Sequence, residues 1–211
     1  MRRELARIGL DADERVHFFD AYRVSGKGPF LKDGSHGCFL SHLEILRSAA
    51  ECGESVLILQ DDCEFSSAVR GLDVPPCDLF YGGFEASDPL DPENSDIVGA
   101  YCMGFSVEAA SKAAAYLGAF YSDPAFEPDP KAASEPDFDS HLRPPIDGAL
   151  VWFRRAHREL RTRFAKIAFQ RSSRSDVTPS TFDRYPILRE LAGVARAVIN
   201  SSTHQDGLRL R

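Results

Sequence analysis

The chain has 211 residues and a formal net charge of −7 at pH 7, with 43% hydrophobic and 27% charged residues, which is typical of a globular domain. No apolar run approaches the roughly 18 residues of a membrane-spanning helix, and the chain does not start with a signal peptide, so we expect a cytoplasmic protein. The five cysteines include no C-x-x-C pair, which argues against a zinc site or a disulfide framework and favours buried free thiols.

Hydrophobic periodicity and turn residues predict an alternation of helices and strands. In chain order we predict a helix at 2–9, a strand at 15–21, an amphipathic helix at 34–52, strands at 55–60, 78–83 and 97–105, a helix at 107–119, a proline-rich surface loop at 122–145 and a last helix at 186–199. This alternation indicates an α/β fold with a largely parallel sheet. We expect one domain over residues 1–180, followed by a basic helix and tail over residues 181–211.

The charge is distributed unevenly along the chain. From Trp152 onward there are 13 Lys and Arg residues against 5 Asp and Glu residues, so a basic C-terminal third follows an acidic body. Such a segment suits anionic lipid headgroups, a phosphorylated glycolipid or a nucleotide, and it equally suits a solvated helix surface. The basic residues are not interleaved with aromatic residues, which argues against nucleic acid as a partner.

Adjacent carboxylates follow the strand predicted at 55–60. The apolar run 56–59 leads directly into Gln60, Asp61 and Asp62. Ligands bind at the carboxyl ends of strands in open α/β sheets, and hard oxygen ligands there suit Mg²⁺ or Mn²⁺ together with a diphosphate. The alternative is that Asp61 and Asp62 only end the strand and begin a turn.

Several segments resemble glycosyltransferase family 25, which includes bacterial lipooligosaccharide glycosyltransferases and collagen galactosyltransferases. Residues 34–43 read G-S-H-G-C-F-L-S-H-L, and the strand end reads L-I-L-Q-D-D over residues 57–62. The family pattern is a G-x-x-G-C-x-x-S-H helix start followed by a strand that ends in Glu-Asp-Asp. Weaker similarities follow in the family's order, at 100–106, at 145–147 and at Gln170 with residues 175–177.

The resemblance implies a GT-A-type, Rossmann-like α/β domain that uses a divalent metal ion, Mn²⁺ or Mg²⁺. The implied reaction transfers a hexose, most often galactose, from a UDP-sugar to an acceptor hydroxyl with inversion. The acceptor would be a lipid-linked saccharide of lipopolysaccharide or cell-surface polysaccharide synthesis. The protein would then act at the cytoplasmic face of the membrane, with a possible peripheral contact to anionic lipid.

The resemblance also implies roles for particular residues. Asp61 and Asp62 would bind the metal ion, and Glu64, two residues after Asp62, would offer a substitute ligand for the acid that the family has at position 60. A base must take the acceptor proton, and the candidates are Asp147, which we favour, His42 and Asp176. A lone helix histidine is more often structural, so we expect His42 to act mainly by positioning. The residues expected to contact the donor are Gly37, Ser41, His42, Gln60, Asp61, Gln170 and Ser175.

Two features depart from the family pattern. Gln60 stands where the family usually has Glu, and an amide brings no charge to a metal site. The chain also starts within what looks like the family's first helix, so the family's N-terminal strand is missing. Both features favour a second hypothesis, in which the protein is a non-catalytic relative that binds a glycan or a nucleotide or serves as a partner subunit. A third hypothesis, a metal-dependent phosphohydrolase, explains the aspartates but not residues 34–43.

Overall fold

The computed structural model describes residues 1–136 and 138–171. The helices are α1 (Arg2–Ile8), α2 (Asp33–Cys52), the single 3₁₀ turn η1 (Ser67–Val69), α3 (Val107–Ser122), α4 (Pro130–Ala133) and α5 (Ile146–Ala156). The strands are β1 (Val56–Leu59), β2 (Cys63–Phe65), β3 (Leu79–Tyr81), β4 (Glu85–Ala86), β5 (Ile97–Val98), β6 (Cys102–Phe105), β7 (Thr162–Phe164) and β8 (Ala168–Gln170). The helix predicted at 186–199 and the domain boundary predicted after residue 180 lie outside the described residues.

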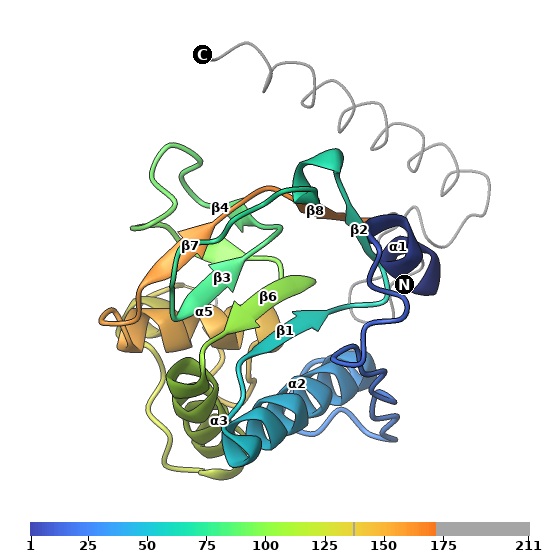
Figure 1. The fold of residues 1–211 in the computed structure, drawn as a ribbon. Helices are drawn as coiled ribbons and strands as arrows, with labels where there is room; N and C mark the ends of the chain where they lie inside the picture. The colour runs from blue at the N-terminus through green and yellow to red at the C-terminus, as the bar shows by residue number, and fades with distance from the viewer. Residues whose placement is uncertain (137, 172–211) are drawn as a thin grey trace, which may run out of the picture.

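A four-stranded sheet in the order β1-β6-β3-β7 forms the centre of the fold (Figure 1). Strand β6 pairs antiparallel with both β1 and β3, whereas β3 and β7 pair parallel. The α/β class is therefore confirmed, but the largely parallel sheet is wrong for the described strands. Two further pairs of short strands, β2-β8 and β4-β5, are also antiparallel.

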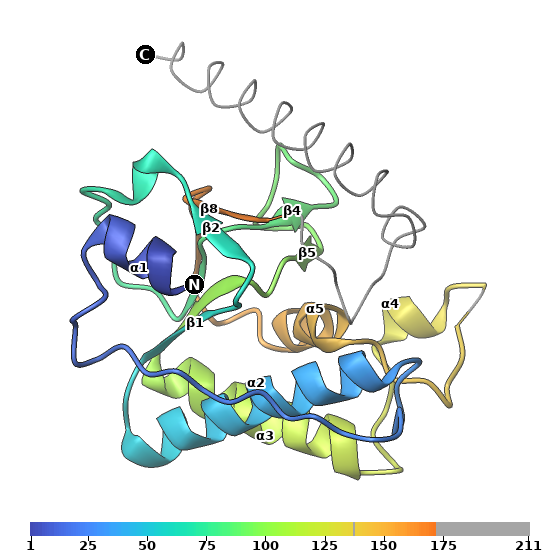
Figure 2. The ribbon, with the colours of Figure 1, turned by 90° about the vertical axis from the view of Figure 1, so that its right-hand side faces the viewer.

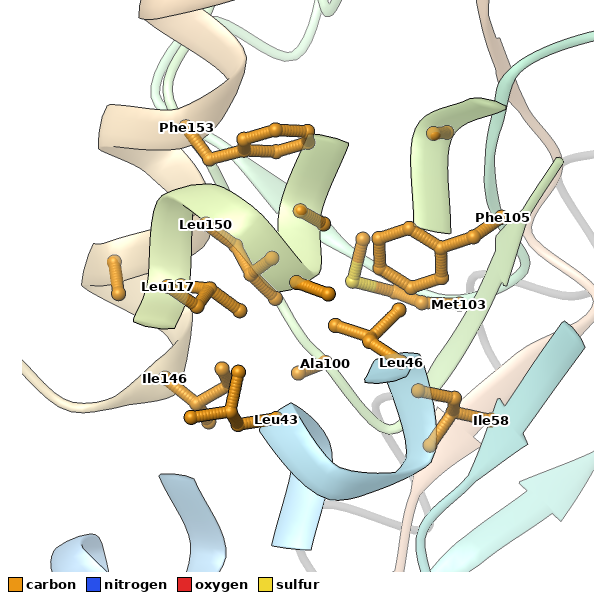
Figure 3. Close-up of a cluster of buried hydrophobic side chains, with 14 of the residues drawn as sticks. Leu43, Leu46, Ile58, Ala100, Met103, Phe105, Leu117, Ile146, Leu150 and Phe153 are labelled. Atoms are coloured by element: carbon orange, nitrogen blue, oxygen red, sulfur yellow. The ribbon is translucent and has the colours of Figure 1, made fainter. Parts of the chain in front are cut away.

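Helices α2, α3 and α5 pack against one another and cover one face of the four-stranded sheet (Figures 1 and 2). Figure 3 shows Leu43 of α2, Leu117 of α3 and Leu150 of α5 converging in this core. Met103 and Phe105 of β6 point into the same cluster, as alternate residues of a strand should. Each buried side chain of this size contributes about 1.5–3 kcal/mol relative to an exposed one, so this cluster dominates the stability of the fold.

A smaller cluster covers the other face of β6. Cys102 packs there with Cys63 and Phe65 of β2 and Ala168 of β8, and Ile8 of α1 packs at its margin. The Glu4 carboxylate accepts a hydrogen bond from the backbone N–H of Phe65 at 3.1 Å, which fixes α1 beside β2. The thiols are all free, but Cys52 is exposed, so the prediction of buried cysteines is confirmed only in part.

The two long helices follow the sequence signals closely. Helix α2 ends at Gly53, whose left-handed conformation (φ 67°) lets its N–H donate back to the last turn. Helix α3 begins at Val107, as predicted, after Ser106, whose hydroxyl accepts a hydrogen bond from the N–H of Ala109.

Three predicted segments differ from the structure. Residues 15–21 form no strand: the side chains of Phe18 and Phe19 are exposed, and no strand within residues 1–136 and 138–171 pairs with this segment. The strand predicted at 97–105 is divided into β5 and β6 by a turn that contains Gly99 (φ 117°). The loop predicted at 122–145 contains the short helix α4, which starts at Pro130 after an Asp129 cap.

Candidate functional site

The predicted site residues that lie near one another come from the turn after β1, from helices α2 and α5 and from strand β8. The turn that follows β1 carries Gln60, Asp61 and Asp62, and the N–H of Cys63 closes it on the Gln60 carbonyl at 3.0 Å. The N–H of Gln60 donates to the carbonyl of Tyr101, just before β6, at 3.0 Å. Helix α2 supplies His42, and the first turn of α5 supplies Asp147.

The family-like motif of α2 presents residues on two sides of the helix. On one side, the Ser41 hydroxyl donates to the Gly37 carbonyl at 2.8 Å and accepts the N–H of Tyr22 at 2.9 Å. A side chain on Gly37 would collide with the Tyr22 carbonyl oxygen. Gly37 and Ser41 thus hold the segment around Tyr22 against α2, and their predicted contacts with a donor stay predictions.

The other side of the motif carries Cys38 and His42, one helical turn apart. Burial raises the pKa of the Cys38 thiol to about 12, and the negative charges of Asp147, Asp62 and Asp61 act in the same direction. All three carboxylates are therefore within electrostatic reach of this thiol. Helix α2, the turn after β1 and the start of α5 thus place three carboxylates around this thiol.

His42 is only 6% exposed, and burial lowers its pKa because the charged imidazolium would be desolvated. The backbone carbonyls of Cys38 and Ala100 and the charge of Asp147 act in the opposite direction. His42 Nδ1 lies 2.9 Å from the Cys38 carbonyl oxygen, so we assign the proton of the neutral ring to Nδ1. Nε2 is then an acceptor.

Asp62 is the most constrained carboxylate of the site. Its Oδ2 accepts a hydrogen bond from the side-chain amide of Gln170 in β8 at 2.8 Å, and its carbonyl accepts the N–H of Arg171 at 2.8 Å. Burial raises the pKa of Asp62, and the neighbouring Asp61 adds to the effect, while Gln170 and Arg171 oppose it. Gln170 therefore contacts an aspartate of the site directly, whereas its predicted contact with a donor stays a prediction.

Asp147 anchors a turn of the backbone. Its Oδ1 accepts the N–H groups of Gly99 at 3.0 Å and Ala100 at 2.8 Å. A side chain on the next residue, Gly148, would lie 2.6 Å from Cβ of Pro144. Position 148 requires glycine because Pro144 packs directly against it.

Two atoms of this site are left without a hydrogen bond. Among the buried side-chain nitrogen and oxygen atoms of the described residues, His42 Nε2 and Asp62 Oδ1 have no partner. An unsatisfied buried polar group costs about 1–3 kcal/mol, so folded proteins rarely keep one without a reason. Both atoms belong to residues that the sequence assigns to the site, and both are acceptors.

The carboxylates fit a divalent metal ion only with help from a ligand. No group of three or more His, Cys, Asp or Glu side chains within residues 1–136 and 138–171 is arranged to hold a metal ion. Asp61 and Asp62 remain as a pair, which suits Mg²⁺ or Mn²⁺ when substrate phosphates complete the coordination. Glu64 lies in β2, where its charge, after the larger effect of Glu4, helps to raise the pKa of Arg7; its role as a metal ligand stays a prediction.

Some site residues were missed by the sequence, and others fall outside the described residues. The backbone N–H groups of Gly99 and Ala100 carry no signal that could have paired them with Asp147, apart from the glycine itself. The backbone contact of Arg171 with the carbonyl of Asp62 was also not predicted. Ser175 and Asp176 lie outside the described residues, so their predicted roles are not tested.

Comparisons with family models, with curated proteins and with solved structures give no match to this chain. The resemblance to glycosyltransferase family 25 therefore rests on the motifs alone. None of the helices in the described part of the chain is long and apolar enough to cross a membrane.

Proposed function

We propose that this protein is a metal-dependent hexosyltransferase with a GT-A-type fold, which transfers a hexose such as galactose from a UDP-sugar to a saccharide hydroxyl with inversion. The observation that carries the proposal is the pair of unpartnered buried acceptors, His42 Nε2 and Asp62 Oδ1, among the residues of the family-like motifs. A bound ligand would satisfy both atoms, which explains why the fold tolerates them.

Asp61 and Asp62 would hold the divalent metal ion. Mn²⁺ or Mg²⁺ at this place would neutralise the charge that develops on a nucleoside diphosphate leaving group. The amide of Gln170 orients Asp62 by occupying Oδ2, which leaves Oδ1 for coordination. The side chain of Gln60 follows β1 directly and would contribute a neutral oxygen or an amide N–H to the donor.

Asp147 is proposed as the base. Two backbone N–H groups fix its Oδ1, and its other oxygen has no hydrogen bond within the described residues. That oxygen can take the proton of the acceptor hydroxyl as the hydroxyl attacks the sugar. The neutral ring of His42 would position the donor or the acceptor by accepting a hydrogen bond at Nε2.

The acceptor and the place of action are proposed on the motifs. A lipid-linked saccharide at the cytoplasmic face of the membrane is the acceptor that the family resemblance implies. The basic residues from Trp152 onward would favour contact with an anionic membrane surface.

Calorimetric titration with UDP tests the donor site. We expect binding in Mn²⁺ that weakens by about tenfold or more in EDTA and in Asp62→Ala, because Asp61 and Asp62 would hold a metal ion that neutralises the charge of the diphosphate. Asp73→Ala removes an exposed aspartate with no ion pair in the described residues and should bind UDP like the wild type. A folded wild-type protein that binds no UDP in either condition would contradict the proposal.

A second candidate function is binding without catalysis. The neutral Gln60 and the lack of a third acidic ligand among the described residues favour it. This candidate predicts that UDP or UDP-galactose binds equally well in Mn²⁺ and in EDTA, and that no UDP is released from UDP-galactose in the presence of saccharide acceptors. Release of UDP that is lost in Asp147→Asn would decide for the enzyme.

A further inference from the structure

A cavity of about 430 Å³ lies at the opposite end of α5 from Asp147. The last turn of α5, the segment before β5 and strand β7 surround it, and its basic lining residues are Arg154, Arg155, His157, Arg158, Arg161 and Arg163. The lining arginines start at Arg154, seven residues after Asp147, so at about 1.5 Å per residue they lie about 10 Å or more further along the helix axis. The basic part of the cavity therefore lies apart from Asp147, while Val151 of its wall stands one helical turn from that residue.

Two of these arginines are already neutralised. Arg155, which is 18% exposed, forms ion pairs with Asp96 at 2.7 Å and with Asp129. Arg161 pairs with Asp78 at 3.1 Å. The pairs of Arg155 join α5 to α4 and to the segment before β5, and the pair of Arg161 joins the starts of β7 and β3. These pairs leave no net charge on the two arginines for a ligand.

Three arginines keep an uncompensated charge. Arg154 donates to the backbone carbonyls of Pro92 and Glu93, which are neutral acceptors. Arg158 and Arg163 are exposed and form no ion pair with any residue of the described chain. Glu93 is the one lining carboxylate that no lysine or arginine of the described residues pairs with, so the cavity is positive.

The position of these charges is not explained by helix capping. Cations near the carboxyl end of a helix are favourable, which accounts for Arg154. This helix-end effect does not account for Arg163, which comes from β7 and lines the same cavity. Like charges gathered in a concave surface repel one another and focus a positive potential, which attracts an anion.

The volume of the cavity and the guanidinium donors that line it indicate the class of ligand. Small-molecule pockets commonly have volumes of about 300–1,000 Å³. The planar guanidinium group donates two parallel hydrogen bonds to phosphate oxygens. We propose that this cavity binds the phosphate or diphosphate group of a small molecule or of a lipid headgroup, without a metal ion. The proposal does not rest on the glycosyltransferase proposal above.

Calorimetric titration with inorganic pyrophosphate in EDTA tests the proposal. We expect binding that weakens by about tenfold or more in Arg158→Ala/Arg163→Ala, since two charge-assisted contacts are lost. The double variant removes side chains without ion pairs in the described chain, so it should fold, and circular dichroism checks this. Arg3→Ala/Arg23→Ala removes two exposed arginines elsewhere and should bind like the wild type.

A vesicle assay distinguishes the two sources of the phosphate. Flotation compares vesicles of phosphatidylcholine alone with an equimolar mixture of phosphatidylcholine and phosphatidylglycerol. Binding to the mixture that the double variant loses supports a lipid headgroup, whereas pyrophosphate binding without flotation supports a soluble ligand. The proposal is overturned if neither probe binds, or if the double variant binds both like the wild type. Asp62→Ala should leave pyrophosphate binding in EDTA intact, which separates this cavity from the carboxylate site.

Discussion

Asp62 shows how burial and charge oppose each other at the scale of a single residue. One of its oxygens is oriented by Gln170, while the other is buried without a partner. The fold thus holds a carboxylate in an environment that disfavours its charge, which is common where a protein binds ligands. If the carboxylate serves a ligand, removing its charge should improve folding and impair binding.

Asp62→Asn should stabilise the protein at neutral pH. Burial raises the pKa of Asp62 in the folded state, so the native protein holds the carboxyl proton more tightly than the unfolded chain does. The contribution of Asp62 to the free energy of unfolding therefore falls as pH rises. The substitution should raise the free energy of unfolding by about 1 kcal/mol, the low end of the range because the group is partly exposed. The unfolding temperature should rise by roughly 2–4 °C near pH 7. Thermal unfolding near pH 7 and near pH 4 checks this.

The gain from Asp62→Asn should shrink toward pH 4, where Asp62 of the wild type is increasingly protonated. Asp73→Asn is the matched control and should change the unfolding temperature little at either pH. A loss of stability in Asp62→Asn at neutral pH would show that the carboxylate is satisfied in the folded protein.

The sequence predicted the residue types of the site better than their contacts. Asp61, Asp62 and His42 stand in recognisable motifs, and Asp147 follows a proline-rich segment. The contact of Asp147 with Gly99 and Ala100 joins residues 47 and 48 positions apart through backbone groups, which have no residue-specific signal. An unpartnered atom such as Asp62 Oδ1 depends on everything packed around it, so no local pattern can predict it.

At the scale of elements, helix α2 connects the core to the site. Its apolar side contributes Phe39, Leu43 and Leu46 to the core, while the Gly37–Ser41 pair holds the segment around Tyr22. The position of that segment therefore depends on the absence of a side chain at residue 37.

Gly37→Ala should destabilise the protein although alanine favours helices. The new methyl group would meet the Tyr22 carbonyl, and relief of such a clash costs about 1–3 kcal/mol. Gly118→Ala in α3 is the matched substitution: its methyl group would meet only the flexible end of Arg47, and it should stabilise by about 0.5–1 kcal/mol. Urea unfolding of both variants measures the difference, and equal effects would mean that the Tyr22 segment moves without cost.

Elements with strong local signals were predicted, and elements that depend on partners were not. Residues 34–52 and 107–119 combine helical periodicity with a terminal glycine or serine, and both form helices. Residues 15–21 have the composition of a strand, but a strand exists only where another strand accepts its hydrogen bonds. The direction of each strand in the sheet likewise depends on partners that are distant in the chain.

At the scale of the whole molecule, an ion-pair network joins segments that are far apart in the sequence. Asp96, next to β5, pairs with Arg155 of α5 and with Lys131 of α4, and Arg155 also pairs with Asp129. Hydrogen bonding to Arg155 lowers the pKa of Asp96 to about 2, which ties this network to the pH dependence of stability.

Asp96→Asn should lower the free energy of unfolding by about 1 kcal/mol at pH 7, after allowance for solvent screening of the ion pair. Because the folded pKa of Asp96 is depressed, the stabilisation is present above the ordinary aspartate pKa near 4 and is lost as pH falls toward about 2. Urea unfolding at several pH values should therefore show the variant and the wild type converging at low pH. Asp20→Asn, which changes an exposed aspartate, serves as the control. A difference in unfolding free energy between Asp96→Asn and the wild type that stays constant with pH would contradict the role of the ion pair.

The contact between Asp62 and Gln170 spans 108 residues of the chain, and it has a consequence for the order of folding. During synthesis, Asp62 emerges long before β8 can cover it, and β1 must wait for β6, which arrives more than 40 residues later. Helices α2 and α3 form from local signals, whereas closure of the strand pair β2-β8 requires almost the entire described chain. Among the described residues, we therefore expect the carboxylates after β1 to be among the last to reach their final surroundings, so that a newly made chain would acquire its core before it acquires its site.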